Sequence, residues 1–257
     1  MDIALLKKQL RQQWGAYLKR SDWYIALEPF LKKWIWTDVH DDPKIKAIRE
    51  PFYALVGEML EQNEIPLGQN GPDFDLKRRQ RIETEQPPID MVIIHHSETD
   101  PEKNVEDEAR KLNAIGAIRQ YAYEFAQDPE LRGKPIWSGH FTSEGKQVFV
   151  AYNGFVAADG SICWLLEDIQ RQYVLWHAGS EVNNRSAALV AIGNYEHATP
   201  PLAQIDGLAR AIQTNYADIP RDAEHIKGHR EVNPARTCPG AFFLGENGWK
   251  NRLLSRL

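Results

Sequence analysis

Met91-Val92-Ile93-Ile94-His95-His96-Ser97 is a short apolar run that ends in two histidines and a serine. Consecutive apolar residues rich in β-branched side chains predict a buried strand. Residues at the end of a buried strand in an α/β sheet face the crevice where ligands bind. The run therefore predicts a central strand and makes His95 a candidate site residue at its end.

A second motif lies close to the C-terminus, in Gly228-His229-Arg230-Glu231-Val232 and Arg236-Thr237-Cys238-Pro239-Gly240. His229 and Cys238 are nine residues apart, and a loop containing proline joins them. Zinc accepts imidazole nitrogen and thiolate sulfur, and a catalytic zinc has three protein ligands and one open position for water. His95 is the best third ligand, so these residues predict a Zn2+ site formed by His95, His229 and Cys238.

Strands and helices alternate from Met91 onward, which predicts an α/β domain with a mixed central β-sheet flanked by helices. Three further strands are expected, at 148–156, 161–166 and 187–192, the first two joined by a hairpin turn at Asp159-Gly160. Three helices are expected, over 105–125, after Thr199-Pro200-Pro201, and around 249–254.

The first part of the chain, residues 1–63, has helical periodicity and predicts a helical N-terminal region. Pro29 is expected to divide or kink its second helix, and Pro51 to break its third. The four tryptophans of this region either form a carbohydrate-binding platform or belong to the core, and helical spacing favours the core. They are Trp14, Trp23, Trp34 and Trp36. Residues 64–90 are rich in Gly, Pro and charge and predict a linker before a domain at 91–257.

Composition limits the classes of partner. The net charge of −5 gives no basic footprint, so we expect no nucleic-acid partner and no anionic membrane surface. No run of about 18 apolar residues is present, and the first residues lack the layout of a secretory signal. The two cysteines, Cys163 and Cys238, either form one disulfide or stay reduced. Cys163 is expected to be a buried strand residue.

Five blocks of sequence resemble one known family. They are Ile93-Ile94-His95-His96-Ser97, Tyr152 through Asp159-Gly160, Trp176-His177-Ala178-Gly179, Asn183 through Asn194, and Gly228 through Gly240. In this order and spacing, residues from about Met91 to Leu257 resemble the zinc-dependent N-acetylmuramoyl-L-alanine amidases. That family includes amidase-type phage lysozymes and peptidoglycan recognition proteins. The helical N-terminal third lies outside the resemblance.

The resemblance implies roles for individual residues. His95, rather than His96, would bind zinc with His229 and Cys238. Tyr152 stands at the position of the catalytic tyrosine, where it would orient water or carry a proton. Arg236 stands two positions before the last ligand, where a lysine is usual, and would stabilise the developing oxyanion.

Three residues are expected to bind substrate on the same grounds. His177 would line the groove for the muropeptide, although a structural histidine bonded to backbone is the alternative. Asn184 and Arg185 would bind carboxylates of the stem peptide, since Arg offers bidentate recognition, or would belong to a surface loop.

Two features depart from the family. Recycling amidases of the cytoplasm carry a glutamate where this chain has Val190, whereas phage lysozymes lack it, so a tyrosine-type mechanism is expected. The region between Ser97 and Tyr152 is longer than in compact members, and its residues 137–141 are expected to reshape the substrate groove.

The expected function is hydrolysis of the bond between N-acetylmuramic acid and L-alanine in peptidoglycan or muropeptides. The alternative is peptidoglycan recognition without turnover, but non-catalytic members typically lose the cysteine ligand, and Cys238 is present. A third possibility makes the helical region a partner-binding or wall-binding unit. We expect a soluble protein, either cytoplasmic or released to the cell wall by another route. The choice between polymeric and soluble substrate, the stem-peptide specificity and the oligomeric state stay open.

Overall fold

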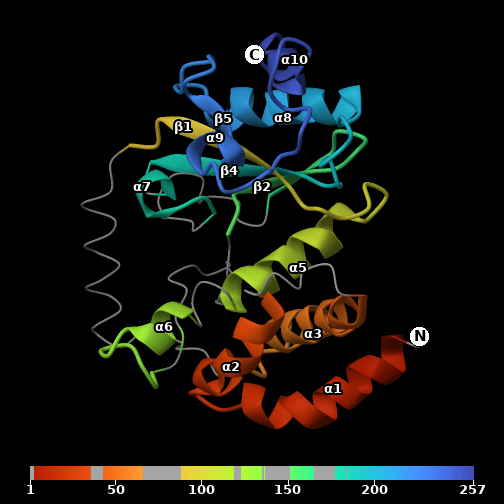
Figure 1. Ribbon diagram of the computed structural model, residues 1–257, viewed down its shortest axis with the longest axis vertical. Helices are drawn as coiled ribbons and strands as arrows, with labels where there is room; N and C mark the ends of the chain where they lie inside the picture. Colours follow the sequence, from red (N-terminus) through yellow and green to blue (C-terminus); the bar gives the residue numbers. More distant parts are fainter. Residues whose placement is uncertain are drawn as a thin grey trace. The chain divides into compact units, whose positions relative to one another are not determined.

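The computed structural model describes residues 3–35, 43–65, 88–118, 123–134, 136, 151–164, 177–183 and 185–257 (Figure 1). The chain forms two compact units. One comprises Met1–Arg79 and Arg110–Phe149, and the other comprises Gln80–Ala109 and Val150–Leu257. Among the described residues, none of the helices has both the length and the apolar character that a bilayer crossing requires.

The second unit is built on a five-stranded sheet with the strand order β3-β2-β4-β1-β5. Its strands are β1 (Met91–His96), β2 (Gly154–Val156), β3 (Ile162–Trp164), β4 (Ser186–Ala191) and β5 (Ile226–Gly228). β1 pairs in parallel with β4 and with β5, β2 pairs in parallel with β4, and β3 is antiparallel to β2. The predicted mixed sheet with flanking helices is confirmed.

The two central strands are buried along almost their whole length. In β1 only Met91 is partly exposed, and every residue of β4 is buried. Central parallel strands are covered on both faces, which is why they are continuous apolar runs rather than alternating ones. Val92 and Ile94 join the core beneath helix α8 (Leu202–Asn215) and α10 (Trp249–Leu254), which cover one face of the sheet (Figure 1). Because strand side chains alternate, His95 lies on the opposite face.

Two short helices complete this unit beside the strands, α7 (Ser180–Asn183) and α9 (His229–Val232). The predicted turn at Asp159-Gly160 is present between β2 and β3. Gly160 has a φ of +85°, and the Asp159 carboxylate accepts a hydrogen bond from the Ser161 amide at 2.8 Å. The turn therefore uses glycine where a left-handed backbone is needed.

The first unit is helical and contains α1 (Ile3–Leu18), α2 (Trp23–Ile35), α3 (Pro43–Glu61) and α6 (Tyr123–Gln127). Trp14 and Trp23 are buried in its core, as the core interpretation predicts. The side chains of Trp34 and Trp36 lie outside the described residues. The predicted break at Pro51 is wrong, because α3 continues through it. Buried residues that follow the proline, including Phe52 and Leu55, hold the helix in place.

Within the span 105–125, where one long helix is predicted, the structure describes two helices on either side of residues that lie outside its description. α5 spans Val105–Gly116, α6 begins at Tyr123, and residues 119–122 lie outside the described part of the chain. Ala114, Ile118 and Phe125 belong to the core of the helical unit. The region between Ser97 and Tyr152 thus contributes packing to that unit, while the division at 63 and 90 stays a prediction.

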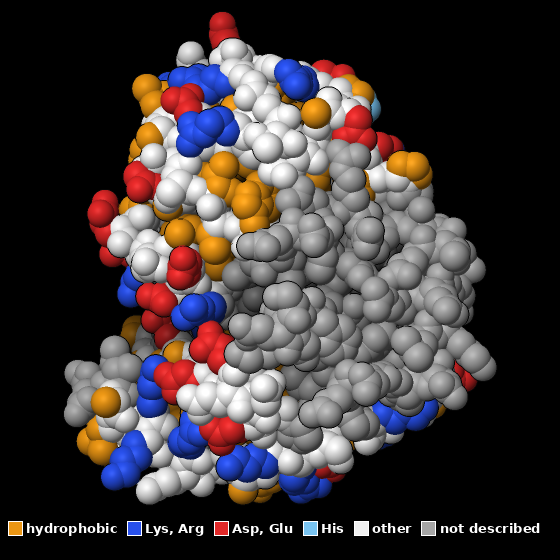
Figure 2. All heavy atoms as spheres, turned by 180° about the vertical axis from the view of Figure 1, so that it is seen from behind, with side chains coloured by type: hydrophobic (Ala, Val, Ile, Leu, Met, Phe, Trp, Pro, Cys, Tyr) orange, Lys and Arg blue, Asp and Glu red, His pale blue; other side chains and the backbone are white. Residues whose placement is uncertain are grey.

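Acidic and basic side chains alternate over the described surface in Figure 2, and no extended field of Lys and Arg is visible on the described part of that face. This distribution agrees with the small net charge of the sequence.

The packing of α8 on the hairpin turn gives a test of the fold. We expect Gly207→Ala to lower the free energy of unfolding by about 1–3 kcal/mol. A Cβ at Gly207 would lie 2.7 Å from the Gly160 carbonyl oxygen and 2.7 Å from a Val156 methyl group. This clash outweighs the advantage of about 1 kcal/mol that alanine has over glycine in a helix. Urea unfolding measures the difference.

Gly57→Ala in α3 is the matched control, because its Cβ would meet Ala114 at an ordinary 3.8 Å. That variant is expected to gain up to about 1 kcal/mol. Equal stability of the two variants would contradict the close approach of α8 to the turn.

Candidate metal centre

The three candidate ligands come together beyond the carboxyl ends of β1 and β5. They are His95, His229 and Cys238. Their candidate ligand atoms all lie within 4.8 Å of one another. The Cys238 Sγ is 3.7 Å from the His95 Nδ1, and the rings of His95 and His229 are 4.7 Å apart between centroids. The three ligands predicted from the sequence therefore form one cluster.

Parallel pairing explains why the two histidines meet. Ile94 of β1 lies opposite Gly228 of β5, so His95 and His229 each follow one member of a paired position. The carboxyl ends of parallel strands lie at the same edge of a sheet, where open α/β sheets bind ligands. On the other side of β1, His95 lies opposite the buried Val190 of β4.

The loop that carries Cys238 is held by backbone contacts. The Arg230 amide donates to the Cys238 carbonyl at 2.7 Å, and the Arg230 guanidinium donates to the Gly240 carbonyl at 3.2 Å. Gly240 has a φ of +114°, and a Cβ there would lie 1.8 Å from the Tyr195 carbonyl oxygen. Only glycine allows this approach. The His96 amide donates to the Cys238 sulfur at 3.4 Å, which favours a thiolate at that position.

His96 itself points away from the cluster, because its Nδ1 accepts a hydrogen bond from the Tyr195 amide at 2.9 Å. Of the adjacent histidines, only His95 therefore has a ring nitrogen in the cluster.

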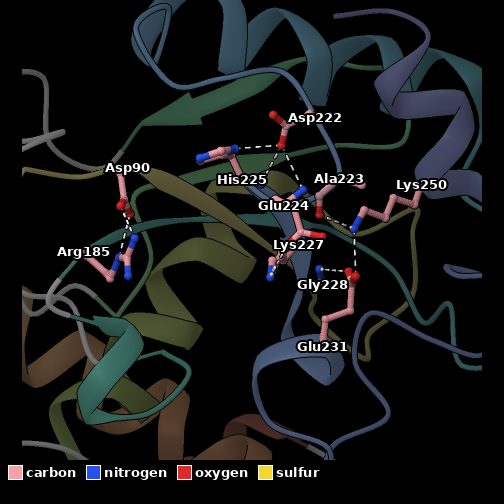
Figure 3. Close-up of polar contacts among 10 residues, drawn as sticks. All are labelled: Asp90, Arg185, Asp222, Ala223, Glu224, His225, Lys227, Gly228, Glu231 and Lys250. Carbon is pink, nitrogen blue, oxygen red and sulfur yellow. Dashed lines mark hydrogen bonds and ion pairs between the residues drawn. The ribbon is translucent and has the colours of Figure 1, made fainter.

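An ion pair between the buried Lys250 and the partly buried Glu231 supports the backbone at His229 (Figure 3). The Glu231 carboxylate accepts from the Gly228 amide at 2.7 Å and from the Lys250 ammonium at 2.8 Å. Lys250 also donates to the Ala223 carbonyl at 2.9 Å and is only 6% exposed. Through Glu231, these contacts tie Gly228, the residue before His229, to the body of the unit.

His177 is buried against His95 rather than lining an open surface. Its Nδ1 lies 3.0 Å from the His95 Nε2, and its Nε2 lies 3.0 Å from the Ser186 hydroxyl. The Asn183 side-chain oxygen accepts from the amides of His177, Ala178 and Gly179 at 2.9–3.2 Å. The ring is thus held at both nitrogens and through its own backbone.

The cluster is electrically neutral in the absence of a cation. Burial lowers the pKa of His177 to about 3, and burial together with the charge of Arg236 lowers that of His229 to about 4. Burial also moves the pKa of His95 well below its ordinary value and raises the pKa of the Cys238 thiol to about 12. Neutral imidazoles present free lone pairs, and a buried thiol gives up its proton to a metal ion. The donor set therefore fits zinc.

The two predicted catalytic residues lie beside the cluster. The Tyr152 ring meets the His95 ring edge-on, with centroids 5.1 Å apart. Arg236 is exposed, yet its charge lowers the pKa of both His229 and Cys238. A half-buried tyrosine ring and a permanent cation therefore lie close to the cluster.

The predicted substrate-binding residues lie in different settings. Arg185 forms a bidentate ion pair with Asp90, with one N–O distance of 2.8 Å (Figure 3). Asn184 lies outside the described residues, as do residues 137–141. Substrate binding by Arg185, Asn184 and His177 stays a prediction.

Neither cysteine forms a disulfide, so the alternative of a disulfide between them is wrong. Cys163 lies in β3 as predicted, but it is half-buried rather than buried, because β3 is an edge strand of the sheet.

Ser186, Asn183, Glu231 and Lys250 were not singled out by the sequence. Asn183 and Ser186 lie inside a block that resembles the family, and Glu231 lies inside the His229 motif, so position was the available signal for these three. For Lys250 the sequence offers no signal, because its partner Glu231 is 19 residues away in the chain.

A family model described as "N-acetylmuramoyl-L-alanine amidase" matches residues 85–241. Among solved structures, the endolysin amidase LysCS from Clostridium intestinale is 17% identical, with a TM-score of 0.39, covering 66% of this chain and 87% of that one. Drosophila PGRP-LB is 22% identical, with a TM-score of 0.39, covering 60% of this chain and 76% of that one. Among curated proteins, none matches this sequence.

The ion pair between Lys250 and Glu231 gives one prediction. We expect Lys250→Met to lower the free energy of unfolding by about 2 kcal/mol, because the partly buried Glu231 carboxylate would lose its charged hydrogen-bond partner. Lys227→Met is the matched control, since Lys227 pairs at 3.3 Å with the exposed Glu224 (Figure 3). A surface pair contributes under about 1 kcal/mol. Urea unfolding measures both variants. An equal loss of unfolding free energy in the two would show that burial does not strengthen the Lys250 pair.

The lowered pKa values of the histidines give a second prediction, which concerns how stability depends on pH. In the metal-free chain, the contribution of these histidines to the free energy of unfolding should be complete above about pH 6.5. It should decrease as the pH falls below that value. In that window the unfolded state binds more protons than the folded state, whose His177 and His229 titrate at about 3 and about 4. Each histidine contributes a slope of about 1.4 kcal/mol per pH unit.

The measurement is urea unfolding of the metal-free protein between pH 5 and pH 8. His177→Asn should show a shallower slope than the unmodified chain, whereas His197→Gln, at an exposed position, should not. An unchanged slope in His177→Asn would refute the assignment.

Proposed function

This chain belongs to the N-acetylmuramoyl-L-alanine amidase family, and we propose that it hydrolyses the amide bond between N-acetylmuramic acid and L-alanine in peptidoglycan or muropeptides. The observation that carries the proposal is the convergence of His95, His229 and Cys238 within 4.8 Å. Two imidazoles and one thiol are a three-ligand set for catalytic zinc, which leaves a fourth position for water or substrate.

Zinc held by these residues would supply an activated water at neutral pH and would polarise the scissile carbonyl. The chain holds its ligands ready, because both histidines are neutral at pH 7. The Cys238 thiol must lose its proton on binding, and the His96 amide that donates to its sulfur favours the thiolate. Retention of this cysteine supports hydrolysis over recognition alone.

Arg236 and Tyr152 complete the proposed site. Arg236 keeps its charge at any relevant pH, so it stabilises an oxyanion but cannot act as a general acid. Such electrostatic groups commonly contribute about 10²–10³ in rate. The Tyr152 hydroxyl orients the attacking water or carries a proton. In this proposal residues 91–257 carry the activity.

The test is digestion of purified peptidoglycan with the zinc-loaded chain, with and without a chelator, and with products identified by mass spectrometry. Free lactyl groups on muramic acid and free L-alanine N-termini are expected, and the chelator should abolish both. Products with that bond intact at every zinc loading would overturn the amidase proposal and leave recognition without turnover.

Cys238→Ser is expected to lose zinc and turnover together, since a thiolate ligand is replaced by a weak hydroxyl. Cys163→Ser is the matched control, because Cys163 is also outside any disulfide but lies in β3, away from the cluster. Zinc content by elemental analysis and hydrolysis should both survive in the control. A zinc-free yet fully active Cys238→Ser protein would refute the ligand assignment.

A further inference from the structure

One hydrogen-bonded chain runs from the backbone of α7 to the candidate metal ligand His95. The Ser186 hydroxyl donates to the Val182 carbonyl at 2.7 Å. The same oxygen lies 3.0 Å from the His177 Nε2. The other nitrogen of that ring, Nδ1, lies 3.0 Å from the His95 Nε2. The side chains that form this chain, Ser186, His177 and His95, are at most 7% exposed, so water does not compete for these contacts.

The direction of each bond follows from counting protons. A carbonyl oxygen only accepts, and a serine hydroxyl has one proton. Ser186 donates that proton to Val182, so its oxygen must accept from His177. The His177 Nε2 therefore carries a hydrogen.

The count continues through the imidazole. His177 is neutral because it is buried and its ring nitrogens contact a hydroxyl and another imidazole, not a carboxylate. A neutral imidazole has one N–H, so with Nε2 protonated the Nδ1 accepts. His95 must then donate from its Nε2, which leaves the His95 Nδ1 without a proton. That nitrogen is the one that lies 3.7 Å from the Cys238 sulfur.

We infer that Ser186 and His177 are positioning residues that fix the tautomer of His95, so that its Nδ1 lone pair faces the metal site before any metal binds. Metal-binding histidines usually donate their other N–H to a carboxylate, a carbonyl or water, and that bond selects the ligating nitrogen. Here a second histidine replaces the usual acceptor, and a serine in turn fixes the second histidine. The identity of the metal rests on the proposed function, but the tautomer is a property of the chain alone.

Two further features keep this chain of bonds rigid. Ser186 is the first residue of β4 and pairs with Met91, so its position is set by the sheet. Asn183 holds the backbone of His177 through three amide bonds. His177 therefore cannot turn its ring over without breaking the contacts at both of its nitrogens.

The deciding experiment is nitrogen NMR of the full-length, metal-free protein with labelled histidine, which distinguishes protonated from bare ring nitrogens. Resonances of His95 and His177 are assigned by their loss in the His95→Gln and His177→Asn variants. Both residues are expected to carry the proton on Nε2 at pH 7. A proton on the His95 Nδ1 would overturn the inference.

Zinc affinity, measured by competition with a chelator, tests the consequence. His177→Leu removes the acceptor and should weaken zinc binding by about 10–100-fold, the usual cost of losing such a partner. His177→Asn places an oxygen where Nδ1 lay and should restore most of the affinity. Ser186→Ala and Ser186→Thr form a second pair, of which only the threonine keeps the hydroxyl.

His197→Gln at an exposed position is the control and should bind zinc like the unmodified protein. Unchanged affinity in a folded His177→Leu protein, checked by circular dichroism, would overturn the inference. If the unmodified chain bound no zinc, the proposed function would fail, while the NMR spectrum would still decide the tautomer.

Discussion

The parallel pairing of β1 with β4 on one side and with β5 on the other is the constraint on which the site depends. It brings the carboxyl ends of β1 and β5 side by side. His95 and His229 therefore become neighbours, although 133 intervening residues separate them in the chain. The pairing is stabilised by apolar burial, because Ile93, Ile94 and all of β4 are removed from water. The His95 ring at the end of β1 is buried as well, while His229 is half-buried.

Burial decides the electrostatics of the site. Each candidate ligand is shifted toward its neutral form, with histidine pKa values lowered and that of the thiol raised. The positive charge of Arg236 at the edge reinforces this effect on His229. A cluster without charge but with three donor atoms gains most from binding a divalent cation, because the cation supplies the charge that lets the thiol ionise. Stability of the metal-free fold and affinity for metal are thus linked through the same groups.

Several features were predictable because they depend on local pattern. The apolar run before His95 is a strand, and Asp159-Gly160 is a turn, as periodicity and turn chemistry indicate. The proximity of His95, His229 and Cys238 was inferred from strand-end position and a metal-ligand residue set. Pro51 was misjudged, because local propensity predicts a break that burial of Phe52 and Leu55 overrides. Cys163 was misjudged because an apolar run does not reveal which strand lies at a sheet edge.

The chain alone was enough to specify an α/β domain, its ligand residue types and the family they resemble, because these follow from spacing along the sequence. It could not specify that Lys250 neutralises Glu231, or that Ser186 and His177 act on His95. Those contacts join residues distant in the sequence, and any serine or lysine looks the same until packing removes its water and leaves a single partner. Only the folded backbone sets which partner that is, and with it the direction of each hydrogen bond.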